Sequence, residues 1–313
     1  MLDWSAAATR FIAFAAILVL FGASAFSIYG LAPQEPSGPN LLRNRLRVVA
    51  LIAATAGLIA SLLWLMLEAV TLSGESAAVL SASAVWSVIT DTHFGQVGAY
   101  RSVLLALIVL ALATLKFHRH STWVVNSLLA AVVAASLAWT GHGTFDSGIP
   151  GWVHLGGDLL HLLSAGLWVG ALVVLCLLCL SALRRGAVTS DPEFAYGIAR
   201  FSSVGVAVVA VLLLSGAVNS WFLIGPVAWR AAFTTLYGRL LLIKIALFAL
   251  MLTLAAINRL RLVPKLQRAA LATDGNAVWR VLRATLIVET TLAMLVLGLV
   301  AVIGTLEPPI SAQ

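Results

Sequence analysis

The stretch that decides the fold runs from His154 to Leu183 and reads HLGGDLLHLLSAGLWVGALVVLCLLCLSAL. About 20 apolar residues are enough for a helix to cross the hydrocarbon layer of a bilayer, and this stretch exceeds that length. A helix satisfies its backbone N–H and C=O groups internally, as the membrane interior requires. The stretch therefore predicts a transmembrane helix whose histidines and carboxylate are gathered at one end.

Working outward from this helix, seven further stretches have the length and apolar character of membrane spans. The predicted spans are residues 11–32, 48–67, 94–115, 122–140, 154–183, 201–223, 234–258 and 284–306. The 313-residue chain is 61% hydrophobic and 10% charged, whereas a soluble domain has about 25% charged residues. This composition excludes a soluble enzyme. We expect an all-α polytopic membrane protein with eight transmembrane helices in one transmembrane domain over residues 1–313.

The basic residues set the expected orientation. Most of the 19 Lys and Arg residues fall in alternate connections, those after the first, third, fifth and seventh predicted spans. Connections rich in Lys and Arg stay in the cytoplasm, so both termini are expected outside. The formal net charge of +7 then belongs to loops that flank membrane lipid, and no nucleic-acid partner is expected. On the outer side, residues 77–89 are apolar enough to form a short helix on the membrane surface.

Four of the six histidines fall on the expected outer side: His93, His142, His154 and His161. Asp158 and His161 follow His154 at offsets of four and seven residues, which places all three on one helix face. Neutral imidazoles bind transition metals, and a carboxylate either ligates the metal or orients an imidazole ring. These donors predict a metal site, because ionisable side chains in membrane helices are costly and usually functional. The alternative is a set of interfacial polar residues that pair with each other and with water.

The same helix face continues inward to Cys176 and Cys179, the two cysteines of the chain. They lie about 33 Å from His154 at 1.5 Å per residue, near the reducing side, so no disulfide is expected. Thiolates would suit a copper(I) path, although buried cysteine also commonly packs as a small apolar residue. Glu289 is expected to be protonated, hydrogen-bonded to a neighbour such as Asn258, or part of a proton or ion path. Lys244 lies close enough to the outer edge of the seventh predicted span for its ammonium group to reach the membrane surface.

Three stretches resemble the CopD/PcoD family of bacterial inner-membrane copper-homeostasis proteins, and the likeness extends over most of the chain. They are Gly141-His142-Gly143, the run from Gly157 to Gly170, and the block from Phe201 to Pro264, which contains LSGAVN at 214–219 and TLYGRLLLIK at 235–244. The family-like core covers residues 141–304. The resemblance implies an eight-helix protein linked to copper movement, often alongside a periplasmic copper-binding protein of the CopC type. It places His142, Asp158 and His161 on the family's outer histidines and carboxylate.

The sequence thus predicts a copper-handling protein of the bacterial inner membrane that has no enzymatic activity. Copper ion is expected to bind at His142, His154, Asp158 and His161, with His93 as a further candidate, and to move toward the cytoplasm. Cys176, Cys179 and Glu289 are the candidates for an inner path. One alternative is a haem-binding electron-transfer protein with His161 and either His142 or His93 as axial ligands. Another is a docking partner that holds a periplasmic copper carrier and transports nothing.

Overall fold

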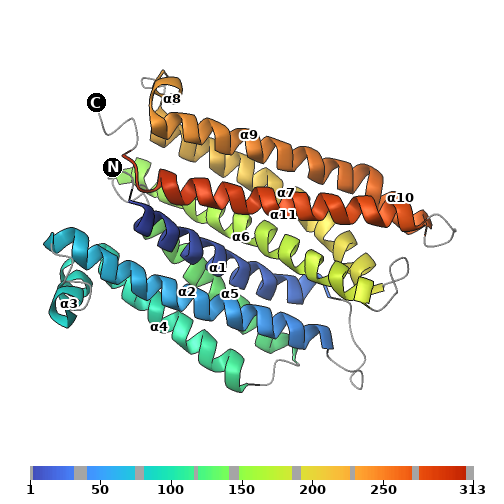
Figure 1. The fold of residues 1–313 in the computed structure, drawn as a ribbon, viewed down its shortest axis with the longest axis horizontal. Helices are drawn as coiled ribbons and strands as arrows, with labels where there is room; N and C mark the ends of the chain where they lie inside the picture. The colour runs from blue at the N-terminus through green and yellow to red at the C-terminus, as the bar shows by residue number, and fades with distance from the viewer. Residues whose placement is uncertain are drawn as a thin grey trace.

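The computed structural model describes residues 3–31, 41–74, 81–115, 119–140, 148–184, 192–225, 230–269 and 275–307. All regular structure in these ranges is helical. Figure 1 shows the long helices lying side by side along one common direction. Eight helical segments have the length and hydropathy of membrane spans within the described residues. The predicted all-α polytopic architecture is confirmed.

The spanning segments follow the predicted order. They are α1 (Trp4–Tyr29), α2 (Leu41–Ser73), α4 (His93–Thr114), α5 (His120–Ala135) with the 3₁₀ turn η2 (Ser136–Thr140), α6 (Gly148–Arg184), α7 (Pro192–Ile224), α9 (Leu236–Ile257) and α11 (Gly275–Ile303). A π-helical turn, η4 (Asn258–Leu262), and helix α10 (Val263–Ala269) continue α9, and the short helices are α3 (Ala82–Asp91) and α8 (Ala231–Thr234). Several helices begin before the predicted spans, because polar residues beyond the hydrocarbon layer can continue a helix that apolar residues have established.

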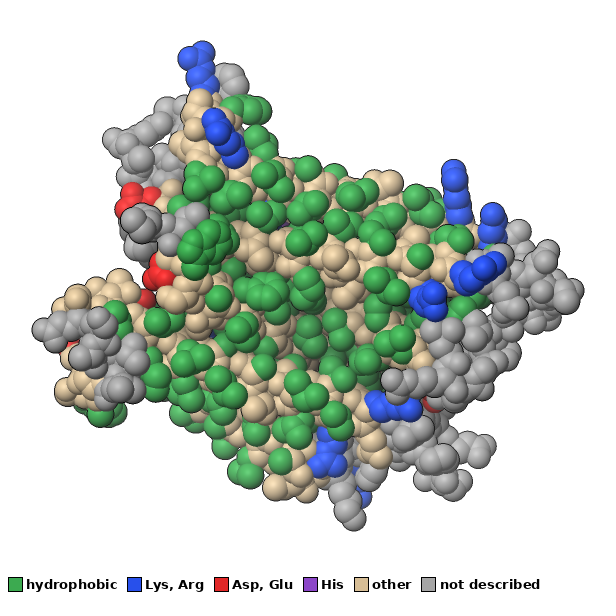
Figure 2. Space-filling view, in the orientation of Figure 1, with side chains coloured by type: hydrophobic (Ala, Val, Ile, Leu, Met, Phe, Trp, Pro, Cys, Tyr) green, Lys and Arg blue, Asp and Glu red, His purple; other side chains and the backbone are tan. Residues whose placement is uncertain are grey.

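Both described chain ends lie at the same end of the bundle (Figure 1). We call this the N/C end; it holds the start of α1 and the last residues of α11. In Figure 2 carboxylates are visible at the N/C end, and many Lys and Arg side chains gather at the opposite end, with a smaller basic group above α8. This distribution has the asymmetry that the positive-inside rule associates with a cytoplasmic opposite end.

Glycines join the two halves of the chain where α1 crosses α6. A Cβ at Gly22 would lie 2.0 Å from the carbonyl oxygen of Gly166, and one at Gly170 would lie 2.4 Å from the carbonyl carbon of Gly22. Only hydrogen fits between these backbones. Such small residues four apart allow close helix contact in membranes, where apolar burial between helices gains little over lipid. The contact fixes α6, and with it the functional side chains that α6 carries, against α1.

Replacing Gly170 with alanine should therefore destabilise the folded protein by about 1–3 kcal/mol, as overpacking of a close contact does. Thermal unfolding of the purified protein in detergent measures this effect. Gly298→Ala is the matched control, because a Cβ at Gly298 has no atom within 4 Å. Equal midpoints for the two variants would mean that α1 and α6 do not meet at this contact.

Candidate functional site

A polar cluster lies near the N/C end, where α6, α7 and α9 meet. We define it as His154, Asp158 and His161 of α6, Ser215 and Asn219 of α7, and Lys244 of α9. The side-chain amide of Asn219 donates a hydrogen bond of 2.6 Å to Asp158 Oδ1. The carboxylate of Asp158 also interacts electrostatically with His154 and Lys244. The cluster therefore holds its one carboxylate between an amide donor and a cation.

The hydrogen bonds around His161 are compatible with a proton on Nδ1. His161 Nδ1 lies 3.1 Å from the Ser215 hydroxyl oxygen. That hydroxyl donates its own hydrogen to the backbone carbonyl of Val211, at 2.6 Å. When its one hydrogen is donated to Val211, the Ser215 oxygen accepts from Nδ1–H, an arrangement that leaves the lone pair of neutral His161 on Nε2. A ring oriented in this way has the tautomer that a metal-binding imidazole needs.

His154 lies one helical turn from Asp158, closer to the start of α6. Its ring is 2% exposed and stacks on Phe222 of α7, with centroids 4.7 Å apart and an interplanar angle of 7°. His154 and His161 are separated by about 10 Å along the helix axis at 1.5 Å per residue. One face of α6 thus carries two imidazoles at different depths along the helix, and each contacts a side chain of α7.

Below the polar cluster, two cavities follow one another between α6, α7, α9 and α11. The upper cavity has a volume of about 270 Å³ and is lined by His161, Lys244 and Phe248, among others. The lower cavity, of about 240 Å³, is lined by Asn258, Arg259 and Glu289, among others. Trp168 lines both. Its indole, which stands between the cavities, packs edge-on against Phe248 of the upper cavity, with centroids 5.9 Å apart.

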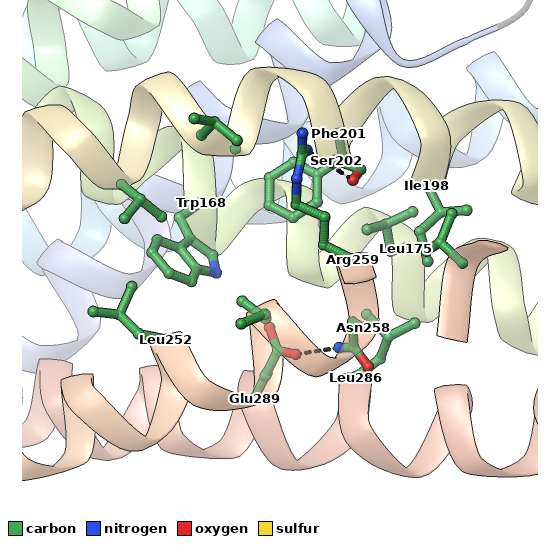
Figure 3. Close-up of a pocket in the computed structure, with 16 residues that line it drawn as sticks. Trp168, Leu175, Ile198, Phe201, Ser202, Leu252, Asn258, Arg259, Leu286 and Glu289 are labelled. Atoms are coloured by element: carbon green, nitrogen blue, oxygen red, sulfur yellow. Dashed lines mark hydrogen bonds between the residues drawn. The ribbon is translucent and has the colours of Figure 1, made fainter. Parts of the chain in front are cut away.

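The lower cavity contains a buried carboxyl group. Asn258 Nδ2 donates a hydrogen bond to Glu289 Oε1, and the Thr285 hydroxyl donates to Asn258 Oδ1 at 2.7 Å. Figure 3 shows Glu289 facing Asn258, with Trp168 at the other side of the cavity. The amide belongs to the π-helical turn that ends α9, an irregularity that is frequent at functional sites. The pairing of Glu289 with Asn258, one of the three alternatives expected from the sequence, is confirmed.

Both cysteines lie on the stretch of α6 beyond Trp168. Cys176 Sγ is 3.3 Å from the hydroxyl of Thr290, next to Glu289 on α11, and Cys176 interacts electrostatically with Glu289. Cys179 is buried, and both thiols are free. Cys176 is thus a neighbour of the lower carboxyl group, as the predicted inner path requires, while any metal ligation by either thiol stays a prediction.

The remaining predicted donors are more scattered. His93 is exposed at the first residue of α4, a helix that packs on α2, α3 and α5. His142 lies outside the described residues. Within the ranges that the structure describes, no three His, Cys, Asp or Glu side chains come together in a group that could hold a metal ion. The site of four donors with His142 therefore stays a prediction.

Sequence reasoning missed Ser215 and Asn219 as partners of α6, the π-helical turn that carries Asn258, and the position of Trp168 between the cavities. Ser215 and Asn219 are four residues apart and so share a face of α7, which is a signal that the sequence does contain. Which face meets α6 depends on how the helices pack, and no periodicity encodes that. Lys244 was expected to reach the outer edge by itself, but it instead acts electrostatically on Asp158 and His161.

Comparison with known proteins gives two family matches. The model described as "Copper resistance protein D-like, N-terminal domain" matches residues 1–152, and the model described as "Copper resistance protein D" matches residues 197–303. No solved structure matches the chain.

Three curated proteins are similar to the chain. Copper resistance protein D of Pseudomonas syringae pv. tomato is 35% identical over 310 residues, which cover 97% of each chain. Inner membrane protein YebZ of Escherichia coli (strain K12) is 28% identical, over 98% of this chain and 100% of its own length. Copper transport protein CutJ of Bacillus subtilis (strain 168) is 33% identical over 186 residues, which are 59% of this chain and 33% of that protein.

Proposed function

The chain belongs to the copper resistance protein D family, and on that premise we propose that it binds copper at the N/C end and carries it across the membrane. It is a multi-pass inner-membrane protein that handles copper. The family is one of copper resistance and transport proteins, and it is not a known enzyme family. Copper would therefore be the transported ion and not the cofactor of a reaction.

The observation that carries the proposal is the orientation of His161. Its Nδ1–H is held by Ser215, which leaves the Nε2 lone pair as a donor, and the ring lines the upper cavity. His154, two turns nearer the N/C end, is the donor that an incoming ion would meet first. We propose that copper passes from His154, helped by His142 and Asp158, to His161 at the top of the cavity.

The charge balance of the polar cluster favours copper over hard cations. Asp158 is already engaged by Asn219 and Lys244, so it offers little net negative charge to Mg²⁺ or Ca²⁺, which need oxygen ligands. Imidazole nitrogen then dominates the donor set. Nitrogen sites follow the Irving–Williams order, in which copper(II) exceeds zinc, and imidazole also suits copper in general.

The proposed route continues through the two cavities. An ion leaving His161 would enter the upper cavity, pass the Trp168–Phe248 ring pair, and reach Glu289 in the lower cavity. Passage requires these rings to move. Cys176, beside Thr290 and Glu289, would supply a soft ligand on this inner part of the route.

The proposed orientation of the protein in the membrane rests on the distribution of its basic residues. If the N/C end faces the periplasm, the basic opposite end faces the cytoplasm as the positive-inside rule requires, and transport along the route is inward. A periplasmic copper-binding protein of the CopC type would then deliver copper at the N/C end, near His93.

Copper uptake by the purified full-length protein in sealed liposomes tests the proposal. We expect copper, offered as copper(I) or copper(II), to accumulate inside the vesicles faster than in protein-free liposomes, and zinc to accumulate more slowly than copper. Uptake equal to that of protein-free liposomes for both copper oxidation states would contradict transport. A Soret band in the purified protein would instead support the haem-binding alternative.

A further inference from the structure

A second buried polar group lies in the N-terminal half, at the same end of the bundle but on other helices. Arg10 of α1 and Arg101 of α4 approach one aromatic ring, Trp64 of α2. The guanidinium carbon of Arg10 is 4.8 Å from the centre of this ring and that of Arg101 is 5.4 Å from it. Arg101 is 1% exposed and Arg10 is 9% exposed. The proposed copper route uses neither residue.

The charges of this group do not cancel. Glu68, one turn after Trp64 on α2, interacts electrostatically with Arg10. The charged side chain that acts on Arg101 is Arg10, and the two cations repel each other. Among the described residues, the one carboxylate that acts on this group, Glu68, acts on Arg10, and the surplus positive charge falls on Arg101, the more deeply buried of the two guanidinium groups.

Arg101 also lacks hydrogen-bond acceptors among the described residues. Nε, Nη1 and Nη2 of Arg101 are all buried and have no hydrogen-bond partner within the described ranges, and the same is true of Nε of Arg10. Ser61, one turn before Trp64 on the same face of α2, also has a buried hydroxyl without a partner. By contrast, the Arg10 guanidinium lies against Gly304, just beyond the end of α11, where the negative end of the helix dipole offsets part of its charge.

A buried guanidinium with its N–H groups unused is costly, and more so within a membrane. A cation–π contact with Trp64 offsets only a part of that cost. Water could accept hydrogen bonds from Arg101 but would not neutralise it. An anion does both, because the guanidinium N–H groups form a fork that is suited to an anionic acceptor. Because Arg101 is only 1% exposed, a monatomic anion, which needs less space than a phosphate or a lipid headgroup, is the better fit.

We propose that the N-terminal half binds one halide ion, such as chloride, between Arg101 and Arg10 beside Trp64. The ion would accept hydrogen bonds from Arg101, separate the two cations, and tie α4 to α1 and α2. This proposal does not depend on copper transport, since its residues lie on helices other than those that line the two cavities.

The test is the thermal unfolding of the full-length protein in detergent, with copper chelated and ionic strength held constant. Replacing gluconate by chloride or bromide should raise the midpoint saturably, because a ligand that binds only the native state stabilises it. Arg101→Gln should abolish this halide dependence, and Arg101→Lys should weaken halide binding at least tenfold, because lysine lacks the fork. Equilibrium binding of radioactive chloride should give one ion per wild-type chain.

Arg239→Gln is the matched control, because Arg239 is an exposed arginine of α9 near the same end of the bundle. It should keep the full halide dependence. Equal midpoints in gluconate and chloride for the wild-type protein would overturn the proposal, as would an unchanged halide response in Arg101→Gln. If Arg101→Gln does not fold, Arg101→Lys and the direct chloride measurement decide the question in its place.

Discussion

His161→Asn should lower the affinity of the purified protein for copper at least tenfold and reduce copper uptake into liposomes by a similar factor. Asparagine keeps an N–H donor near the position of Nδ1, so it can still bond to Ser215, but it removes the Nε2 lone pair. Changes around metal-binding histidines typically cost tenfold to a hundredfold in affinity, and loss of the ligand itself should cost no less. Titration of the reconstituted protein with copper gives the affinity, and stopped-flow uptake gives the rate.

The matched control is His120→Asn, since His120 is an exposed histidine at the start of α5, at the opposite end of the bundle. It should leave both measurements unchanged. Ser215→Ala provides a second variant, which removes the hydrogen-bond acceptor of Nδ1–H and leaves the ring in place. It should weaken copper binding, because the proton of the imidazole is then no longer held on Nδ1. Unchanged copper affinity in a folded His161→Asn protein would show that His161 is not a ligand, whatever the protein transports.

Glu289→Gln should slow copper transport at least tenfold while leaving the affinity at the N/C end unchanged. Glutamine preserves the volume of the side chain and can still accept the hydrogen bond from Asn258. It removes the carboxyl group that would ionise to compensate a cation in the lower cavity, where the low dielectric makes such compensation strong. A tenfold loss of rate corresponds to about 1.4 kcal/mol.

The measurement is copper uptake into liposomes beside a copper titration of the same preparation, so that rate and binding are separated. Glu307→Gln is the control, because Glu307 is exposed beyond the end of α11. A transport rate equal to the wild-type rate would mean that no charge at position 289 assists the ion, and the inner half of the proposed route would be wrong. A parallel loss of copper affinity would place Glu289 in the binding site instead.

The number of helices and the order of the spans could be predicted because apolar length alone decides whether a segment crosses a membrane. The boundaries were less accurate: α7 begins at Pro192 and α11 at Gly275, well before the predicted positions 201 and 284. Polar residues outside the hydrocarbon layer neither require nor forbid a helix. The pairing of Glu289 with Asn258 was among the expected alternatives, since each residue lies in an otherwise apolar span.

The sequence by itself determined that His154, Asp158 and His161 share one face of a membrane helix, because a fixed rotation per residue relates them. Only the tertiary structure decided that Ser215 contacts Nδ1 of His161, that Lys244 acts on Asp158, and that Trp168 stands between two cavities. It likewise brought Arg10 and Arg101 to a single tryptophan. Positions along one helix follow from its own geometry, whereas contacts between helices depend on how close their backbones come. Here that closeness rests in part on glycines such as Gly22 and Gly170, whose lack of a side chain lets α1 and α6 touch.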